Sequence, residues 1–312
     1  MTRVTLALDG PFDLAGTLRP LSRGPYDPTI RLSAGIAWLA MRARGGAVTV
    51  HVRLATDHVV ADAWGPGADE LGDWLPSLLG LAPGSAATGD LRDATHPVIA
   101  DLARRHPGIR IPATRAVLEA LVPAILEQKV TGSEARRAWS GLIRAHGEAA
   151  PHPAPATAAT MPGRPLRLTP PPGTLARLPY YAFHPFGVEQ RRADLIRRIA
   201  ARAAWFEGIV DLPLPEAHAR LRSVPGIGPW TAAEVAVRAL GDPDAVSIGD
   251  FHLPNLVAWA LAGEPRGTDE RMLELLAPFA GRRALAMRLL EVSGLRAPRY
   301  GPRLSPRRIE GI

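Results

Sequence analysis

A chain of 312 residues, 46% of them hydrophobic, is long enough for two packed domains, and its composition excludes a disordered protein. Its apolar runs are too short to span a membrane, and its start lacks the features of a signal peptide. The absence of cysteine excludes disulfides, zinc–thiolate sites and cysteine-ligated iron–sulfur clusters. The net charge of +7 favours a polyanionic partner, with a solvated basic surface as the alternative.

The first part of the chain predicts an antiparallel sheet. Residues 4–61 form alternating or β-branched runs, which are separated by turn residues such as Gly45 and Gly46. Two segments with helical spacing, residues 12–21 and 68–79, interrupt this pattern. We therefore expect an α+β domain over residues 1–88.

The remainder predicts a helical domain over residues 89–296. Pro123 is expected to kink the helix predicted over residues 113–129. A Pro- and Ala-rich stretch at about 149–167 predicts a mobile linker, and the basic tail 297–312 is expected to be loosely ordered. A helix is also expected to open at His96-Pro97, and the other expected helices cover residues 132–146, 187–206, 215–222, 230–240, 251–261, 268–276 and 282–294.

The stretch Leu221–Trp230, which reads L-R-S-V-P-G-I-G-P-W, predicts a helix-hairpin-helix. Gly226 and Gly228 permit backbone torsions that let the chain reverse between two short helices, and Pro229 suits the start of the second. The start of a helix exposes N–H groups at the positive end of its dipole, which favours a phosphate. A tight corner between two helices, without any ligand, is the alternative.

Longer stretches resemble the HhH-GPD superfamily of base-excision DNA glycosylases, and within it the AlkA-type family (DNA-3-methyladenine glycosylase II). Residues 241–250, G-D-P-D-A-V-S-I-G-D, are similar to the Gly/Pro-rich loop and aspartate that follow the hairpin in that superfamily. Residues 105–131 look like the region that ends in the DNA-inserted loop, residues 182–200 resemble the helix that precedes the hairpin, and residues 10–44 are similar to the AlkA N-terminal domain. The resemblance implies an α+β fold in which a TBP-like antiparallel sheet domain precedes an all-α helix-hairpin-helix glycosylase domain.

By this resemblance, Asp250 is the catalytic aspartate. A carboxylate beside the sugar stabilises the positive charge that develops when the bond to the base breaks, and it can orient or deprotonate the attacking water. Capping of the following helix is the alternative role, and the two are compatible. Asp242 and Asp244 are nearby rivals that are typical of turn residues.

The resemblance places the lesion pocket around Trp230, Phe251, Glu234 and His252. Alkylated purines are cationic, so the faces of aromatic rings attract a flipped base. Trp230 and Phe251 match aromatic positions of AlkA-type enzymes, with core packing as the alternative, whereas Glu234 replaces a tyrosine and puts the substrate range in doubt. His252 has no second histidine at metal-ligand spacing, so a structural or hydrogen-bonding role is expected.

The expected DNA contacts lie on the hairpin and at the end of the helix predicted over residues 113–129. The family inserts an apolar wedge where this chain has Lys129, and an exposed helix end is the alternative for that position. Relatives hold Na⁺ or K⁺ through hairpin carbonyls, which implies such an ion at Val224, and no other metal or cofactor is expected. The expected DNA-binding residues are Gln128, Lys129, Val224, Gly226, Ile227, Gly228 and Thr231.

Trp230 stands where strand-cleaving relatives carry the lysine that forms a Schiff base, and Lys129 is the single lysine of the sequence. The sequence therefore predicts a monofunctional DNA glycosylase of base excision repair, which removes 3-methyladenine- or 7-methylguanine-type bases without AP lyase activity. A catalytically silent or altered-specificity damage-binding protein is the alternative, and a glycosylase for oxidised guanine or mismatches is disfavoured but not excluded. We expect a monomer in the cytoplasm, associated with the nucleoid, with damaged double-stranded DNA as partner and no membrane contact.

Overall fold

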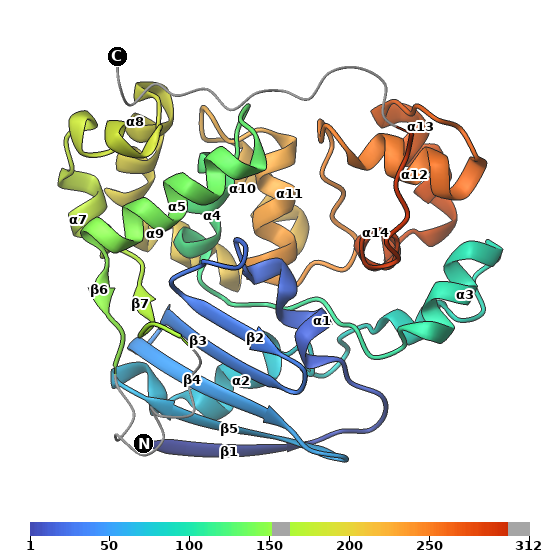
Figure 1. Cartoon of the computed structure of the whole chain (residues 1–312), viewed down its shortest axis with the longest axis horizontal. Coiled ribbons are helices and arrows are strands. Elements are labelled where there is room, and N and C mark those ends of the chain that lie inside the picture. The colour runs from blue at the N-terminus through green and yellow to red at the C-terminus, as the bar shows by residue number, and fades with distance from the viewer. Residues whose placement is uncertain (152–162, 299–312) are drawn as a thin grey trace.

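The computed structural model describes residues 1–151 and 163–298. Its N-terminal part is a five-stranded antiparallel sheet with the order β1-β5-β4-β3-β2 (Figure 1). Alternating residues face the two sides of this sheet, as the sequence pattern predicts. The sheet and the helices that accompany it confirm the α+β fold class. The strands are β1 (Thr2–Ala7), β2 (Ile30–Ser33), β3 (Ile36–Ala43), β4 (Gly46–Leu54) and β5 (His58–Trp64).

Helices cover one face of the sheet. Both α1 (Leu14–Leu18) and α2 (Leu71–Leu78) bury their leucines in one core, which also contains the buried valines of β4 and β5. The 3-10 helix η1 (Arg19–Leu21) follows α1 and leads the chain toward the helical part of the molecule.

The opposite face of the sheet carries a stack of aromatic rings. Trp38 lies 3.9 Å from His51 and 5.9 Å from Trp64, between ring centroids. Ala150 and Leu166 pack on this cluster. The expectation of a mobile linker is therefore wrong at both ends of that segment, where the chain buries apolar side chains on the sheet; residues 152–162 lie outside the described part.

A small two-stranded ladder joins these ends. Strands β6 (Glu148–Ala149) and β7 (Arg167–Leu168) pair in antiparallel fashion. Arg167 donates from Nη2 to the carbonyl of Gly147 at 2.6 Å, which fastens the ladder to the end of the preceding helix.

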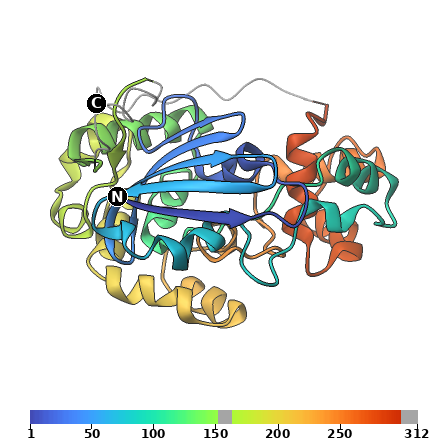
Figure 2. The ribbon, with the colours of Figure 1, turned by 90° about the horizontal axis from the view of Figure 1, so that it is seen from below.

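The helical part forms two groups with separate cores, at opposite ends of the sheet (Figure 2). One group consists of α4 (Val117–Leu126), α5 (Gly132–His146), α7 (Pro172–Arg177), α8 (Gln190–Ala200), α9 (Ala203–Glu207), α10 (Leu214–Arg222) and α11 (Pro229–Val235). The other consists of α3 (Pro97–Arg105), α12 (Leu253–Ala262), α13 (Asp269–Leu276) and α14 (Arg283–Val292). The segment 241–252 passes from the first group to the second, between α11 and α12 (Figure 1).

Several helices begin or end away from their predicted bounds. The helix expected over 113–129 starts at Val117, because Arg115 has a positive φ of 54° and the Glu207 carboxylate accepts the N–H groups of Val117 (2.8 Å) and Leu118 (2.9 Å). The helix expected over 187–206 is divided into α8 and α9. The helix expected over 230–240 widens after α11 into a π-helical turn, η7 (Ala236–Leu240), which ends at Gly241.

Within the described ranges, every helix is too short or too polar to cross a bilayer.

Candidate active site

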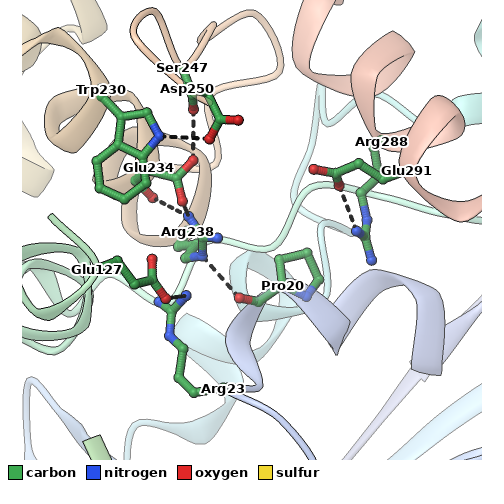
Figure 3. Close-up of polar contacts among 10 residues, drawn as sticks. All are labelled: Pro20, Arg23, Glu127, Trp230, Glu234, Arg238, Ser247, Asp250, Arg288 and Glu291. Carbon is green, nitrogen blue, oxygen red and sulfur yellow. Dashed lines mark hydrogen bonds and ion pairs between the residues drawn. The ribbon is translucent and has the colours of Figure 1, made fainter. Parts of the chain in front are cut away.

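Asp250 lies at the end of the segment that connects the two helical groups, and each of its carboxylate oxygens is held. Oδ2 accepts the indole N–H of Trp230 at 3.0 Å (Figure 3). Oδ1 accepts the backbone N–H groups of His252 (2.7 Å) and Leu253 (2.9 Å), and thereby caps α12. A carboxylate offers about four lone-pair positions, so one position on Oδ2 is left for a substrate atom or a water. Asp250 thus caps a helix and presents a fixed acceptor at the same time.

The two rival aspartates in this segment serve to anchor it. Asp242 is buried, and its Oδ2 lies 2.8 Å from Nε2 of His218 on α10. Asp244 accepts both the backbone N–H (3.0 Å) and the Nε–H (2.8 Å) of Arg283 on α14. Burial alone would raise the pKa of Asp244, but Arg283 holds it below the ordinary value. These contacts fix the start of the segment to both helical groups.

Glu234 lies one helical turn after Trp230 and points beneath the Trp230–Asp250 contact (Figure 3). It pairs with Arg238, one turn further on, and its Oε1 accepts the hydroxyl of Ser247 at 2.7 Å. Burial alone would raise the pKa of this carboxyl, but Arg238, Ser247 and Arg23 together hold it below its ordinary value. Glu234 is therefore an ionised anchor of the segment that carries Asp250.

The same network reaches the N-terminal part of the chain. Arg238 donates from Nε to the carbonyl of Pro20 at 2.9 Å, and the buried Arg23 lies 3.3 Å from Glu127 at the end of α4 (Figure 3). Sequence reasoning identified neither Arg238 nor Ser247. The spacing of Glu234 and Arg238, four residues apart on a helix, is the signal that could have found the ion pair.

The aromatic residues flank the carboxylate differently. Trp230 is half-buried and packs against the core of the first helical group, while its indole nitrogen faces Asp250. Phe251 is 73% exposed and makes an edge contact with the ring of His252 at 5.0 Å. The indole of Trp230 is therefore held against Asp250, whereas the phenyl ring of Phe251 is open to solvent.

The predicted hairpin joins α10 to α11. Gly226 has a φ of 102°, and Ile227 closes the turn by donating its N–H to the carbonyl of Val224 at 3.0 Å. The helical hydrogen bonds begin with the N–H of Ala232, which donates to Gly228 at 3.0 Å. By helix geometry, the N–H groups of Gly228, Trp230 and Thr231 precede this bond and have no carbonyl within the helix.

The remaining predicted DNA contacts lie around this turn. Ile227 and Thr231 are buried, so their side chains support the hairpin from within. Gln128 donates from Nε2 to the carbonyl of Gly226 and to Oγ1 of Thr231, each at 3.0 Å. Lys129 is exposed beside it, with a positive φ of 55°. The α4–α5 connection is thereby fastened to the hairpin, with Lys129 at its tip.

In the described ranges, no three His, Asp or Glu side chains are grouped so that they could hold a metal ion. The carbonyl of Val224 accepts one N–H, from Ile227, and a carbonyl has two lone pairs. One lone pair of this carbonyl is therefore left open.

No protein-family model matches the chain. A Mycobacterium tuberculosis protein described as a probable bifunctional transcriptional activator/DNA repair enzyme AlkA is 33% identical over 149 residues, which are 47% of this chain and 28% of that protein. The chain thus spans well under a third of the length of this relative.

Solved structures match nearly the whole chain. The 3-methyladenine DNA glycosylase of Archaeoglobus fulgidus is 19% identical with a TM-score of 0.74, over 93% of this chain and 98% of that one. The 8-oxoguanine glycosylase/lyase of Clostridium acetobutylicum, solved with DNA, is 15% identical with a TM-score of 0.67, over 89% and 90%. By sequence, about half of the chain is similar to a protein described as AlkA, and by fold nearly the whole chain is similar to solved DNA glycosylases.

Proposed function

We propose that the chain is a monofunctional DNA glycosylase, which hydrolyses the N-glycosidic bond of alkylated purines flipped out of double-stranded DNA. The observation that carries the proposal is the 3.0 Å contact between the Trp230 indole and the Asp250 carboxylate. It brings a surface that attracts a cationic base next to an anion that stabilises a cationic sugar.

The chemistry follows from the fixed carboxylate. As the bond to the base breaks, positive charge develops on the sugar, and an anion held in place by three N–H donors needs no rearrangement to stabilise it. The lone-pair position left on Oδ2 can accept a proton or hydrogen bond from the attacking water. Since the alkylated base leaves as a neutral purine, this scheme needs no general acid.

Hydrolysis without strand cleavage is supported by residue type. A lyase needs an amine that attacks the sugar carbon, and the position that follows Pro229 is occupied by Trp230. The sole lysine, Lys129, lies at the tip of the α4–α5 connection. We further propose that the hairpin N–H groups bind a backbone phosphate, and that the Val224 carbonyl can hold Na⁺ or K⁺.

The test compares wild type and Asp250→Asn on methylated duplex DNA, with release of 3-methyladenine and 7-methylguanine as the readout. We expect release by wild type and a loss of at least about 100-fold in the variant, which keeps its DNA affinity. Equal release by both proteins, or release by neither, contradicts the proposal; in the latter case a silent damage-binding protein remains. A covalent adduct trapped with borohydride on DNA that contains an abasic site would contradict the monofunctional assignment.

A further inference from the structure

A groove of about 310 Å³ lies beside the hairpin, between Pro225 and Gly226 on one side and α8 on the other. Two arginines of α8, Arg191 and Arg198, line it together with Gln128. They are seven residues apart, about two helical turns, so they share one face of the helix. Both arginines are exposed.

The charge in the groove is unbalanced. Asp194 is the acidic residue that lines it, and its carboxylate is paired with Arg197 at 3.1 Å. Arg198 donates to the carbonyl of Pro225 at 3.1 Å, which leaves its positive charge uncompensated. The side chain of Arg191 makes no hydrogen bond and no ion pair with residues 1–151 or 163–298.

The groove has a fixed position relative to the hairpin. Leu195, buried on the same face of α8, packs so closely under Gly226 that a Cβ at that glycine would lie 2.9 Å from its Cδ2. Gln128 ties Gly226 to the end of α4 from the other side. The face of α8 that carries both arginines is therefore packed directly against the hairpin.

A second arginine cluster lies at Trp205 in the first helical group. Arg202, one turn beyond Arg198, and Arg220 on α10 stack on the ring of Trp205, with guanidinium carbons 4.4 Å and 4.3 Å from its centroid. Two cations on one indole repel each other, and a nearby polyanion relieves that repulsion.

We propose that Arg191 and Arg198 form a binding site for a phosphate of the DNA backbone, next to the one that the hairpin N–H groups would hold. A guanidinium binds a phosphate through two parallel N–H donors, and such contacts position the duplex without reading its sequence. The site anchors damaged and undamaged DNA alike. The inference rests on the proposed function only in taking DNA as the partner.

The experiment measures DNA affinity by fluorescence anisotropy over a series of salt concentrations. The probes are an undamaged duplex and the same duplex with a tetrahydrofuran abasic-site analogue, and the protein is the full chain. The test variant is Arg191→Gln/Arg198→Gln. The matched control, Arg92→Gln, removes an arginine whose side chain is 72% exposed on the connection before α3.

Loss of one phosphate contact should lower the slope of log K against log[salt] by about 0.9, so the double variant should lose about 0.9 on both duplexes. Arg92→Gln should leave the slope unchanged, and Arg191→Lys/Arg198→Lys should retain most of it, because the charges remain. A slope loss in the double variant no larger than that of the control overturns the proposal. So does a loss of affinity confined to the abasic duplex.

A parallel measurement separates this inference from the proposed function. Asp250→Asn should lose single-turnover base release and keep the wild-type salt slope, whereas the arginine double variant should lose salt slope. If neither wild type nor any variant releases a base, but the arginine double variant still has a smaller salt slope than wild type, the phosphate site stands and the proposed function fails. Because both arginines are exposed, circular dichroism of the variants should match wild type.

Discussion

Replacing Glu234 by leucine should destabilise the protein strongly. The Glu234 and Arg238 side chains are only 14% and 16% exposed, so the variant leaves a nearly buried guanidinium without its counter-ion. Breaking one partner of such a pair costs about 3–5 kcal/mol. Ser247 also loses the acceptor of its hydroxyl, which adds about 1 kcal/mol.

The ion pair can be isolated by a double-mutant cycle. Glu234→Leu, Arg238→Leu and the double variant are compared by urea denaturation, with the free energy of unfolding as the measured quantity. The double variant contains no unpaired buried charge, so its loss should fall short of the sum of the single losses by about 2 kcal/mol. Additivity within about 0.5 kcal/mol would refute the reasoning. Ser247→Ala is the control that removes the hydroxyl alone and should cost about 1 kcal/mol.

The pH dependence gives a second check on the same pair. The folded-state pKa of Glu234 lies below its ordinary value of 4.5, because its cationic and hydroxyl partners outweigh burial. The stabilisation is therefore complete above about pH 4.5 and is lost as the pH falls through the lower, folded-state pKa. The stability gap between wild type and Glu234→Leu should shrink toward acid pH, and a gap that widens there would contradict this assignment.

Three further predictions concern single side chains. Burial raises the pKa of Glu119 to about 7 despite its hydrogen bonds, so its contribution to folding stability falls as the pH rises from 4.5 to 7. In urea denaturation, the stability of Glu119→Gln relative to wild type should therefore rise by about 1–3 kcal/mol between pH 4.5 and pH 8. A stability difference that stays constant over this range would contradict the assignment. Gly226→Ala, at a φ of 102°, should lower the free energy of unfolding by about 1–3 kcal/mol. Gly228→Ala, with nothing within 4 Å of the added Cβ, should lower it by less than 1 kcal/mol. Equal losses would refute the role of the turn. Trp230→Phe keeps a ring but removes the N–H that holds Asp250. Single-turnover base release should therefore fall about 10-fold with DNA affinity unchanged. Release by the variant at the wild-type rate would show that the contact is not used.

Local sequence determined the features whose physical cause lies within a few residues. The alternation of apolar residues specifies the strands, because successive side chains point to opposite faces. Gly226 and Pro229 specify the hairpin, because one adopts a positive φ and the other suits the first turn of a helix. Asp250 could be found in the same way, since its helix-capping role depends on the residues that follow it directly.

Tertiary structure decided what depends on partners far away in the chain. Glu119 and Glu207 are partly buried carboxylates whose hydrogen-bond partners come from the residue after β7, from β3 and from α4, and Glu207 determines where α4 begins. The Pro- and Ala-rich segment reads as a linker, yet its ends pack on the sheet, since Trp38 and Trp64 offer an apolar surface there.

Glu234 shows the difference most clearly. In the sequence it replaces an aromatic residue and suggests an altered pocket, whereas in the fold it holds Ser247 and Arg238 and supports the segment that carries Asp250. A charged side chain takes the orientation that neutralises it once water is removed. Which partners achieve that is decided by packing between elements, which residue spacing alone does not encode.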